Sequence, residues 1–118
     1  MKIYTIILSY LVFFLLNSQS LAAAQQRIAL VIGNADYRIA PLKNPGNDAA
    51  DMATALKRLG FKVDKHINAE KKQMKRALSQ FGKKLSQPDT VGLFYYAGHG
   101  VQINNRNYLI PIGAEIED

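Results

Sequence analysis

Two short apolar runs constrain the fold more than any other feature of this sequence. The first, residues 28–32, is rich in β-branched side chains and ends at Gly33-Asn34. The second, residues 90–96, leads directly into Ala97-Gly98-His99-Gly100. Both runs are too short for a helix, and a strand that is apolar at every position is typical of one buried on both faces of its sheet. We therefore expect two buried strands, the first of them central.

Helical patterns separate these runs. Residues 45–59 repeat apolar side chains at helical spacing, after Asn44 as N-cap and Pro45 as first helical residue, and Gly60 follows as a terminating glycine. Residues 61–67 alternate apolar with polar, which is typical of a strand nearer the sheet edge. A second helix is predicted from Asn68, as its N-cap, to about residue 86. The order β-α-β-α-β predicts an α/β fold with a parallel sheet and flanking helices.

After Gly100, residues 101–103 and 108–110 predict a β-hairpin. A parallel sheet of three strands leaves an apolar edge unpaired, which is a poor end for a stable domain. We therefore expect residues 25–118 to be the amino-terminal part of a larger domain.

The first 24 residues have the features of a secretory signal peptide. A positive start at Met1-Lys2 precedes an apolar stretch at 3–16, and Ala22 and Ala24 satisfy the small-x-small cleavage pattern. This predicts an exported protein, periplasmic or secreted, without stable membrane association after cleavage. A membrane anchor is the alternative, but the 14-residue stretch falls short of the roughly 20 apolar residues that span a bilayer.

Charge and motif content exclude several function classes. The net charge is +6, and most of the excess cations lie in the second predicted helix, where the pattern indicates a solvated face rather than a nucleic-acid site. Gly33-Asn34 follows the first predicted strand but matches neither the GxGxxG nor the GxxxxGK(S/T) pattern, which argues against a nucleotide-binding domain. Two histidines without any cysteine do not make a zinc site. We expect no cofactor, no metal and no nucleic-acid partner.

Polar clusters follow the predicted strands. Because the carboxyl ends of parallel strands meet at one edge of a sheet, we expect the residues after the first strand, at the start of the first helix and after the third strand to gather there. They are Asn34, Asp36, Tyr37, Asn47, Asp48, Gly98, His99 and Gly100. His66 has no evident partner in the sequence and is predicted to be a surface or half-buried side chain.

Four motifs in order, RIALVIGN (27–34) with Tyr37, LKNPGNDA (42–49), FYYAGHG (94–100) and NYLIP (107–111), resemble the amino-terminal half of caspase-like cysteine peptidases, the group of metacaspases and bacterial caspase-domain proteins. The resemblance covers the chain from about Arg27 onward. It implies a caspase–hemoglobinase fold, a peptide or protein substrate, and a cysteine–histidine dyad in which His99 is the catalytic histidine. Such an imidazole takes the thiol proton or protonates the leaving amine.

The resemblance also implies substrate-binding roles. Gly98 and Gly100 would leave room for the scissile peptide and offer N–H groups near the developing oxyanion. Asp48 matches an acidic residue that lines the pocket for a basic side chain in metacaspase-type members, which implies cleavage after Arg or Lys. An Asp in the first turn of a helix is explained equally well by capping and the helix dipole. Asp36 would shape the same pocket, or serve an ordinary turn.

The nucleophilic cysteine of such enzymes lies about 50 residues after the histidine. This sequence ends 19 residues after His99 and contains no cysteine. We expect the chain alone to be inactive and to be one segment of an active peptidase. The alternative is a non-catalytic caspase-like module that binds peptides or partner proteins.

Overall fold

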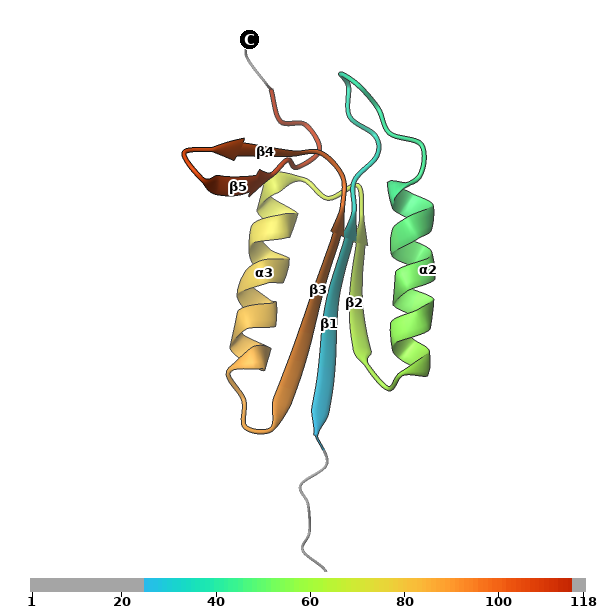
Figure 1. The fold of residues 1–118 in the computed structure, drawn as a ribbon, viewed down its shortest axis with the longest axis vertical. Coiled ribbons are helices and arrows are strands. Elements are labelled where there is room, and N and C mark those ends of the chain that lie inside the picture. The colour runs from blue at the N-terminus through green and yellow to red at the C-terminus, as the bar shows by residue number, and fades with distance from the viewer. Residues whose placement is uncertain (1–24, 116–118) are drawn as a thin grey trace, which may run out of the picture.

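The computed structural model describes residues 25–115, and the predicted signal peptide lies outside them. Within these described residues the chain forms a three-stranded sheet, two helices and a two-stranded hairpin (Figure 1). In chain order the elements are β1 (Gln26–Gly33), α2 (Pro45–Arg58), β2 (Lys62–Ile67), α3 (Lys71–Leu85), β3 (Thr90–Ala97), β4 (Gly100–Ile103) and β5 (Arg106–Leu109). Within the described residues no helix is long and apolar enough to cross a membrane.

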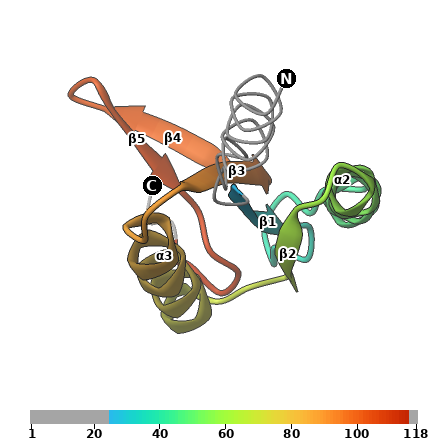
Figure 2. The ribbon, with the colours of Figure 1, turned by 90° about the horizontal axis from the view of Figure 1, so that it is seen from below.

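The sheet has the strand order β2-β1-β3, and β1 runs parallel to both neighbours. The chain moves along the sheet in one direction from β1 to β2, and in the opposite direction from β2 to β3. Because both crossovers are right-handed, the two connecting helices must cover opposite faces of the sheet. Figure 2 shows α2 and α3 on opposite sides of the sheet. The predicted α/β fold with a parallel sheet and flanking helices is therefore confirmed.

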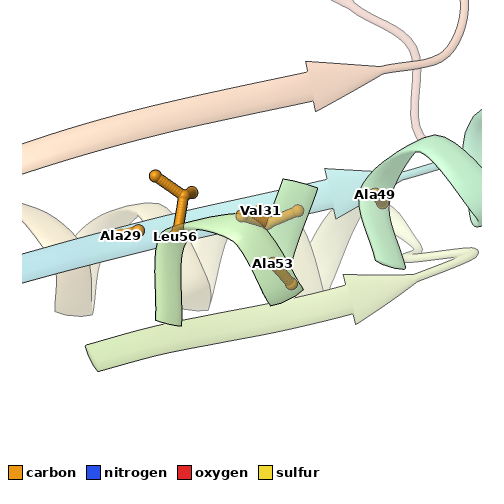
Figure 3. Packing of buried hydrophobic residues seen from close by; sticks show 5 residues of the cluster. All are labelled: Ala29, Val31, Ala49, Ala53 and Leu56. Carbon is orange, nitrogen blue, oxygen red and sulfur yellow. The ribbon is translucent and has the colours of Figure 1, made fainter. Parts of the chain in front are cut away.

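The side chains of β1 enter two hydrophobic clusters alternately, as the period of two in a strand requires. Ala29 and Val31 pack against α2, and Figure 3 shows both beside the side chains that this helix contributes, Ala49, Ala53 and Leu56. Leu30 and Ile32 are fully buried on the other face, against Met74 and Ala77 of α3 and against Ala69. Full burial of a side chain of this size contributes about 1.5–3 kcal/mol. The central, doubly buried strand is confirmed.

The prediction for the third strand is partly wrong. β3 does pair with β1, but its side chains are not buried on both faces, since Val91 and Phe94 are each 41 % exposed. Among the described residues β3 is an edge strand. An apolar pattern reports which side chains a strand has, and it does not report which neighbours cover them.

α2 begins as the sequence predicts, with Asn44 at the N-cap position and Pro45 as its first residue, whereas the start of the second helix differs from the prediction. Asn44 precedes α2, but its side chain makes no capping hydrogen bond. The second helix begins at Lys71 with Glu70 as its N-cap, and the Glu70 N–H donates to Gln73 Oε1 at 3.0 Å. The assignment of Asn68 as N-cap is therefore wrong. At the other end of α2, Gly60 has the left-handed φ of +83° expected of a terminating glycine.

Gly33 allows α2 to begin close to the end of β1. A Cβ at this position would collide with the Pro45 carbonyl oxygen and lie 2.7 Å from the Ala49 Cβ. The N-terminus of α2 therefore lies against the carboxyl edge of the sheet.

The predicted hairpin is confirmed. β4 and β5 pair antiparallel around Asn104 and Asn105, whose φ values of +50° and +60° are those that a type I′ turn needs. The Ile110 N–H donates to the His99 carbonyl oxygen at 3.0 Å and closes the open end of the hairpin.

Candidate active site

His99 lies just beyond the carboxyl end of β3, where the end of β1 is its neighbour. The Asn34 N–H donates to the Ala97 carbonyl oxygen at 2.8 Å and continues the pairing of β1 with β3 past the strand ends. In open parallel sheets this edge is where ligands and catalytic groups gather. The sequence-based placement of His99 together with the loop after β1 is therefore confirmed by the geometry.

The imidazole of His99 is held by a main-chain carbonyl. Its Nε2 lies 2.7 Å from the Ala40 oxygen. A carbonyl oxygen only accepts, so Nε2 carries the proton, and in the neutral ring Nδ1 is left with its lone pair. Ala40 has a φ of +52°, a left-handed conformation that is uncommon for a residue with a side chain. Such local strain persists only where the surroundings hold it, and it often occurs at functional sites.

Two tyrosines underlie the histidine. Tyr37 Oη accepts the His99 N–H at 3.0 Å and donates to the Ile110 carbonyl oxygen at 2.8 Å. Its ring packs on the imidazole with a centroid distance of 4.5 Å and an interplanar angle of 50°. Tyr96 Oη lies 2.8 Å from the His99 carbonyl oxygen, 3.0 Å from that of Ile110 and 3.1 Å from Tyr37 Oη. Burial, reinforced by the bond to Tyr37, raises the pKa of Tyr96 well above its usual range, so the phenol stays protonated.

Gly98 makes this arrangement possible. A Cβ on Gly98 would lie 2.5 Å from Tyr96 Oη and 2.7 Å from Tyr37 Oη. The space that the missing side chain leaves is therefore taken by the two hydroxyls. Gly100 begins β4 and is exposed, and a Cβ there would lie 3.4 Å from the Tyr108 carbonyl oxygen.

Asn34 is a buried residue whose side chain hydrogen-bonds two other segments of the chain. Its side chain is fully buried; Oδ1 accepts the Ala69 N–H at 2.8 Å, and Nδ2 lies 3.3 Å from the carbonyl oxygens of Ala69 and Ile110. It joins β1 to the turn before α3 and to the segment after the hairpin, and it does not face the cavity beside His99.

A cavity of about 450 Å³ opens beside His99. It is lined by Tyr37, Arg38, Ile39, His99, Ile110, Gly113, Ala114 and Glu115. Neither predicted substrate-binding carboxylate lines it. Asp36 is exposed in the loop after β1, where its Oδ2 accepts a hydrogen bond from Asn68 Nδ2 at 2.7 Å. Asp48 is exposed in the first turn of α2.

His66 lies on β2, away from this site. Its Nε2 is 3.0 Å from Asp64 Oδ1, and a third of its side chain is exposed. The half-buried placement of His66 is as predicted. Its partner Asp64 was missed, although residues two apart in a strand point to the same face of the sheet. Among residues 25–115, no group of three His, Cys, Asp or Glu side chains could hold a metal ion.

The sequence analysis missed three contributors to the site. The Ala40 and Ile110 carbonyls are main-chain groups that carry no sequence signal. Tyr96 was interpreted only as part of a strand. Its signal lay in the glycine two residues later, because Gly98 on the same face leaves room for the tyrosine hydroxyl.

The parallel three-stranded sheet with flanking helices and a histidine just beyond the end of β3 is consistent with a caspase-like domain. The comparison with family models agrees, since the model of the caspase domain of peptidase family C14 matches residues 26–117. The chain therefore belongs to the caspase domain family, a protease family. It is similar to the human mucosa-associated lymphoid tissue lymphoma translocation protein 1, with 35 % identity over 92 residues, and to the mouse homologue, with 34 %. These matches cover 77 % of this chain and 11 % of each relative, so the chain spans about a tenth of the length of both curated proteins.

Proposed function

We propose that the intact protein is a cysteine endopeptidase that cuts peptide or protein substrates after Arg or Lys, with His99 as its catalytic histidine. The observation that carries the proposal is the bond between His99 Nε2 and the Ala40 carbonyl oxygen, in a chain of the caspase domain family. That bond fixes the tautomer in which Nδ1 is free to accept a proton. The nucleophile is a cysteine of the intact protein outside these 118 residues, which contain none.

In this proposal Nδ1 takes the proton of the thiol, and the thiolate attacks the scissile carbonyl carbon. The C–S bond forms, and the C–N bond breaks as the imidazolium returns its proton to the leaving amine. Water, deprotonated by the same imidazole, then hydrolyses the thioester and frees the thiol. The Ala40 carbonyl holds the opposite side of the ring throughout and stabilises the imidazolium.

In this proposal, substrate recognition uses residues on both sides of His99 and at the start of α2. Gly98 and Gly100 flank His99, and their N–H groups are candidates for binding the developing oxyanion. Asp48 offers an exposed carboxylate at the start of α2, which Gly33 brings against the edge where His99 lies, and it is the candidate partner of a basic substrate side chain. Asp36 is the second carboxylate of this edge, although its bond to Asn68 gives it a structural role as well.

We further propose that the protein is exported after cleavage behind Ala24 and works without cofactor, metal or nucleic acid. The support is the charge and hydropathy pattern of residues 1–24, which lie outside the described residues. Peptide substrates and protein substrates are the partners that this function needs.

The test uses the full-length gene product and fluorogenic peptides ending in Arg, Lys or Asp. His99→Ala should abolish cleavage, and His66→Ala, the matched control with the chain's other histidine, should not. Thiol alkylation should inactivate the wild-type protein. Cleavage by His99→Ala at the wild-type rate would refute the assignment.

The absence of cysteine from the chain favours a second candidate, a non-catalytic caspase-like module that binds peptides or partner proteins. In that case the full-length product binds Arg- or Lys-containing peptides in calorimetry without turning them over, and alkylation has no effect. The two candidates give opposite results in the same pair of assays.

A further inference from the structure

We infer that Tyr37 and Tyr96 are positioning residues that hold the catalytic histidine in its working orientation, an inference that rests on the proposed role of His99. The hydroxyl of each tyrosine contacts the backbone of His99, and the two hydroxyls contact one another. Neither tyrosine has a role in the chemistry derived above, and both act through His99 rather than on substrate.

Tyr37 fixes the histidine in two ways with one side chain. Its hydroxyl accepts the main-chain N–H of His99, which sets the backbone at the point where the chain leaves β3. Its ring lies against the imidazole face, which sets the ring plane. The Ala40 carbonyl oxygen holds Nε2. His99 is therefore restrained at its ring nitrogen, at the face of its ring and at its main-chain N–H. Tyr37 itself is 8 % exposed, so its position is defined by packing.

Tyr96 secures the other side of the same residue. Its hydroxyl reaches the His99 carbonyl oxygen, the Ile110 carbonyl oxygen and Tyr37 Oη within 2.8–3.1 Å. Each phenol brings a single proton, so the pair shares two protons among these acceptors, and both hydroxyls must stay protonated for the network to hold. The backbone of His99 is thus contacted at its N–H by one tyrosine and at its carbonyl oxygen by the other.

This network takes the place of an orienting carboxylate. In many catalytic dyads and triads an acidic side chain holds the histidine, and a displacement of about 1 Å can cost roughly 100-fold in rate. Within residues 25–115 no carboxylate is hydrogen-bonded to His99. Its ring is held by the Ala40 carbonyl, and its backbone by the two phenols together with the Ile110 N–H. Tyr95, which precedes Tyr96 in β3, packs instead against the cluster on the α2 side of the sheet.

The first experiment is independent of peptidase activity. Tyr37→Phe and Tyr96→Phe each remove one hydroxyl and keep the aromatic ring, and Tyr95→Phe is the matched control. We expect NMR of the full-length protein to show a protected Nε2 proton of His99 in the wild type and in Tyr95→Phe, and its loss to solvent exchange in the other two variants. The ring-proton signals of His66 serve as the internal reference, and they should be the same in all four proteins. A protected Nε2 proton in both hydroxyl-deletion variants would overturn the inference.

The second experiment measures turnover by the full-length protein. Loss of a positioning contact should lower kcat by about 10–100-fold and leave KM unchanged, because the substrate pocket is intact while the base is displaced. Tyr95→Phe should keep the wild-type kcat. An unchanged kcat, or a change in KM alone, contradicts the positioning role. Should Tyr37→Phe fail to fold, Tyr96→Phe decides on the same readouts. If the wild type has no turnover, the proposed function fails and the NMR result still decides whether the tyrosines hold His99.

Discussion

The substitution Gly98→Ala is expected to damage the fold and the site together, because Gly98 carries no side chain where two hydroxyls meet. The added methyl would lie 2.5 Å from Tyr96 Oη, 2.7 Å from Tyr37 Oη and 2.8 Å from Tyr96 Cζ. A hydroxyl at the end of an untethered side chain would simply move aside. Here Tyr37 Oη accepts the His99 N–H and donates to the Ile110 carbonyl oxygen, and Tyr96 Oη shares its one proton between the carbonyl oxygens of His99 and Ile110. Moving the hydroxyls therefore weakens these bonds.

The magnitude follows from these contacts. The phenols must withdraw by roughly 1 Å to reach ordinary van der Waals separation. Forcing a methyl into a packed site costs about 1–3 kcal/mol, and each weakened hydrogen bond costs about 0.5–1.5 kcal/mol more. We therefore expect Gly98→Ala to lower the free energy of unfolding by about 2–4 kcal/mol.

Urea unfolding of the full-length protein measures this loss, and Gly82→Ala is the control. Gly82 lies in α3 with no atom within 4 Å of an added Cβ, so alanine there should stabilise by about 0.5–1 kcal/mol through helix propensity. Combining Gly98→Ala with Tyr96→Phe removes the closest contact and should recover part of the loss, which a double-mutant cycle isolates. A cost of Gly98→Ala below about 0.5 kcal/mol would refute the argument, since surface substitutions without steric consequence fall in that range.

The remaining predictions concern activity and processing. The 118-residue chain alone should show no turnover of Arg- or Lys-ending fluorogenic peptides, because it supplies an imidazole and no thiol; measurable turnover would contradict this. Amino-terminal sequencing of the exported product should read Gln25, whereas Met1 on a membrane-bound product would indicate an anchor. Asp48→Ala in the full-length protein should weaken cleavage after Arg or Lys and spare the dyad; a loss of about 0.5–2 kcal/mol of stability with unchanged preference would instead assign Asp48 to the helix start.

The sequence predicts those parts of the fold that depend on local pattern. The run at 28–32 identifies the central strand because a strand covered by helices on both faces has no polar position, and Leu30 and Val31 are indeed fully buried on opposite faces. The same reasoning fails for β3, where Phe94 is apolar and 41 % exposed. Strand order and the presence of a neighbour are tertiary properties that the composition of one strand does not contain.

Asn68 illustrates how tertiary contacts decide between two local roles. An asparagine before a helix pattern favours an N-cap. In the structure its Oδ1 instead accepts the N–H groups of Ala35 and Asp36 at 2.9 and 3.1 Å, and its φ is +54°. These partners lie more than thirty residues away in the sequence. The short polar side chain of asparagine suits both tasks, so the distant donors determine which one it performs.

The site shows the same division. Local pattern finds His99, since an imidazole between two glycines at the end of an apolar strand is visible in the sequence. Two of the groups that orient it are 59 and 62 residues away, and one of these two is a main-chain oxygen. The Ile110 carbonyl oxygen connects these segments further, because it accepts from Tyr37 and lies within bonding distance of Tyr96 and Asn34. A change that displaces the hairpin therefore moves the acceptor shared by the phenols that hold His99, and the stability of this edge and the orientation of its histidine depend on the same hydrogen bonds.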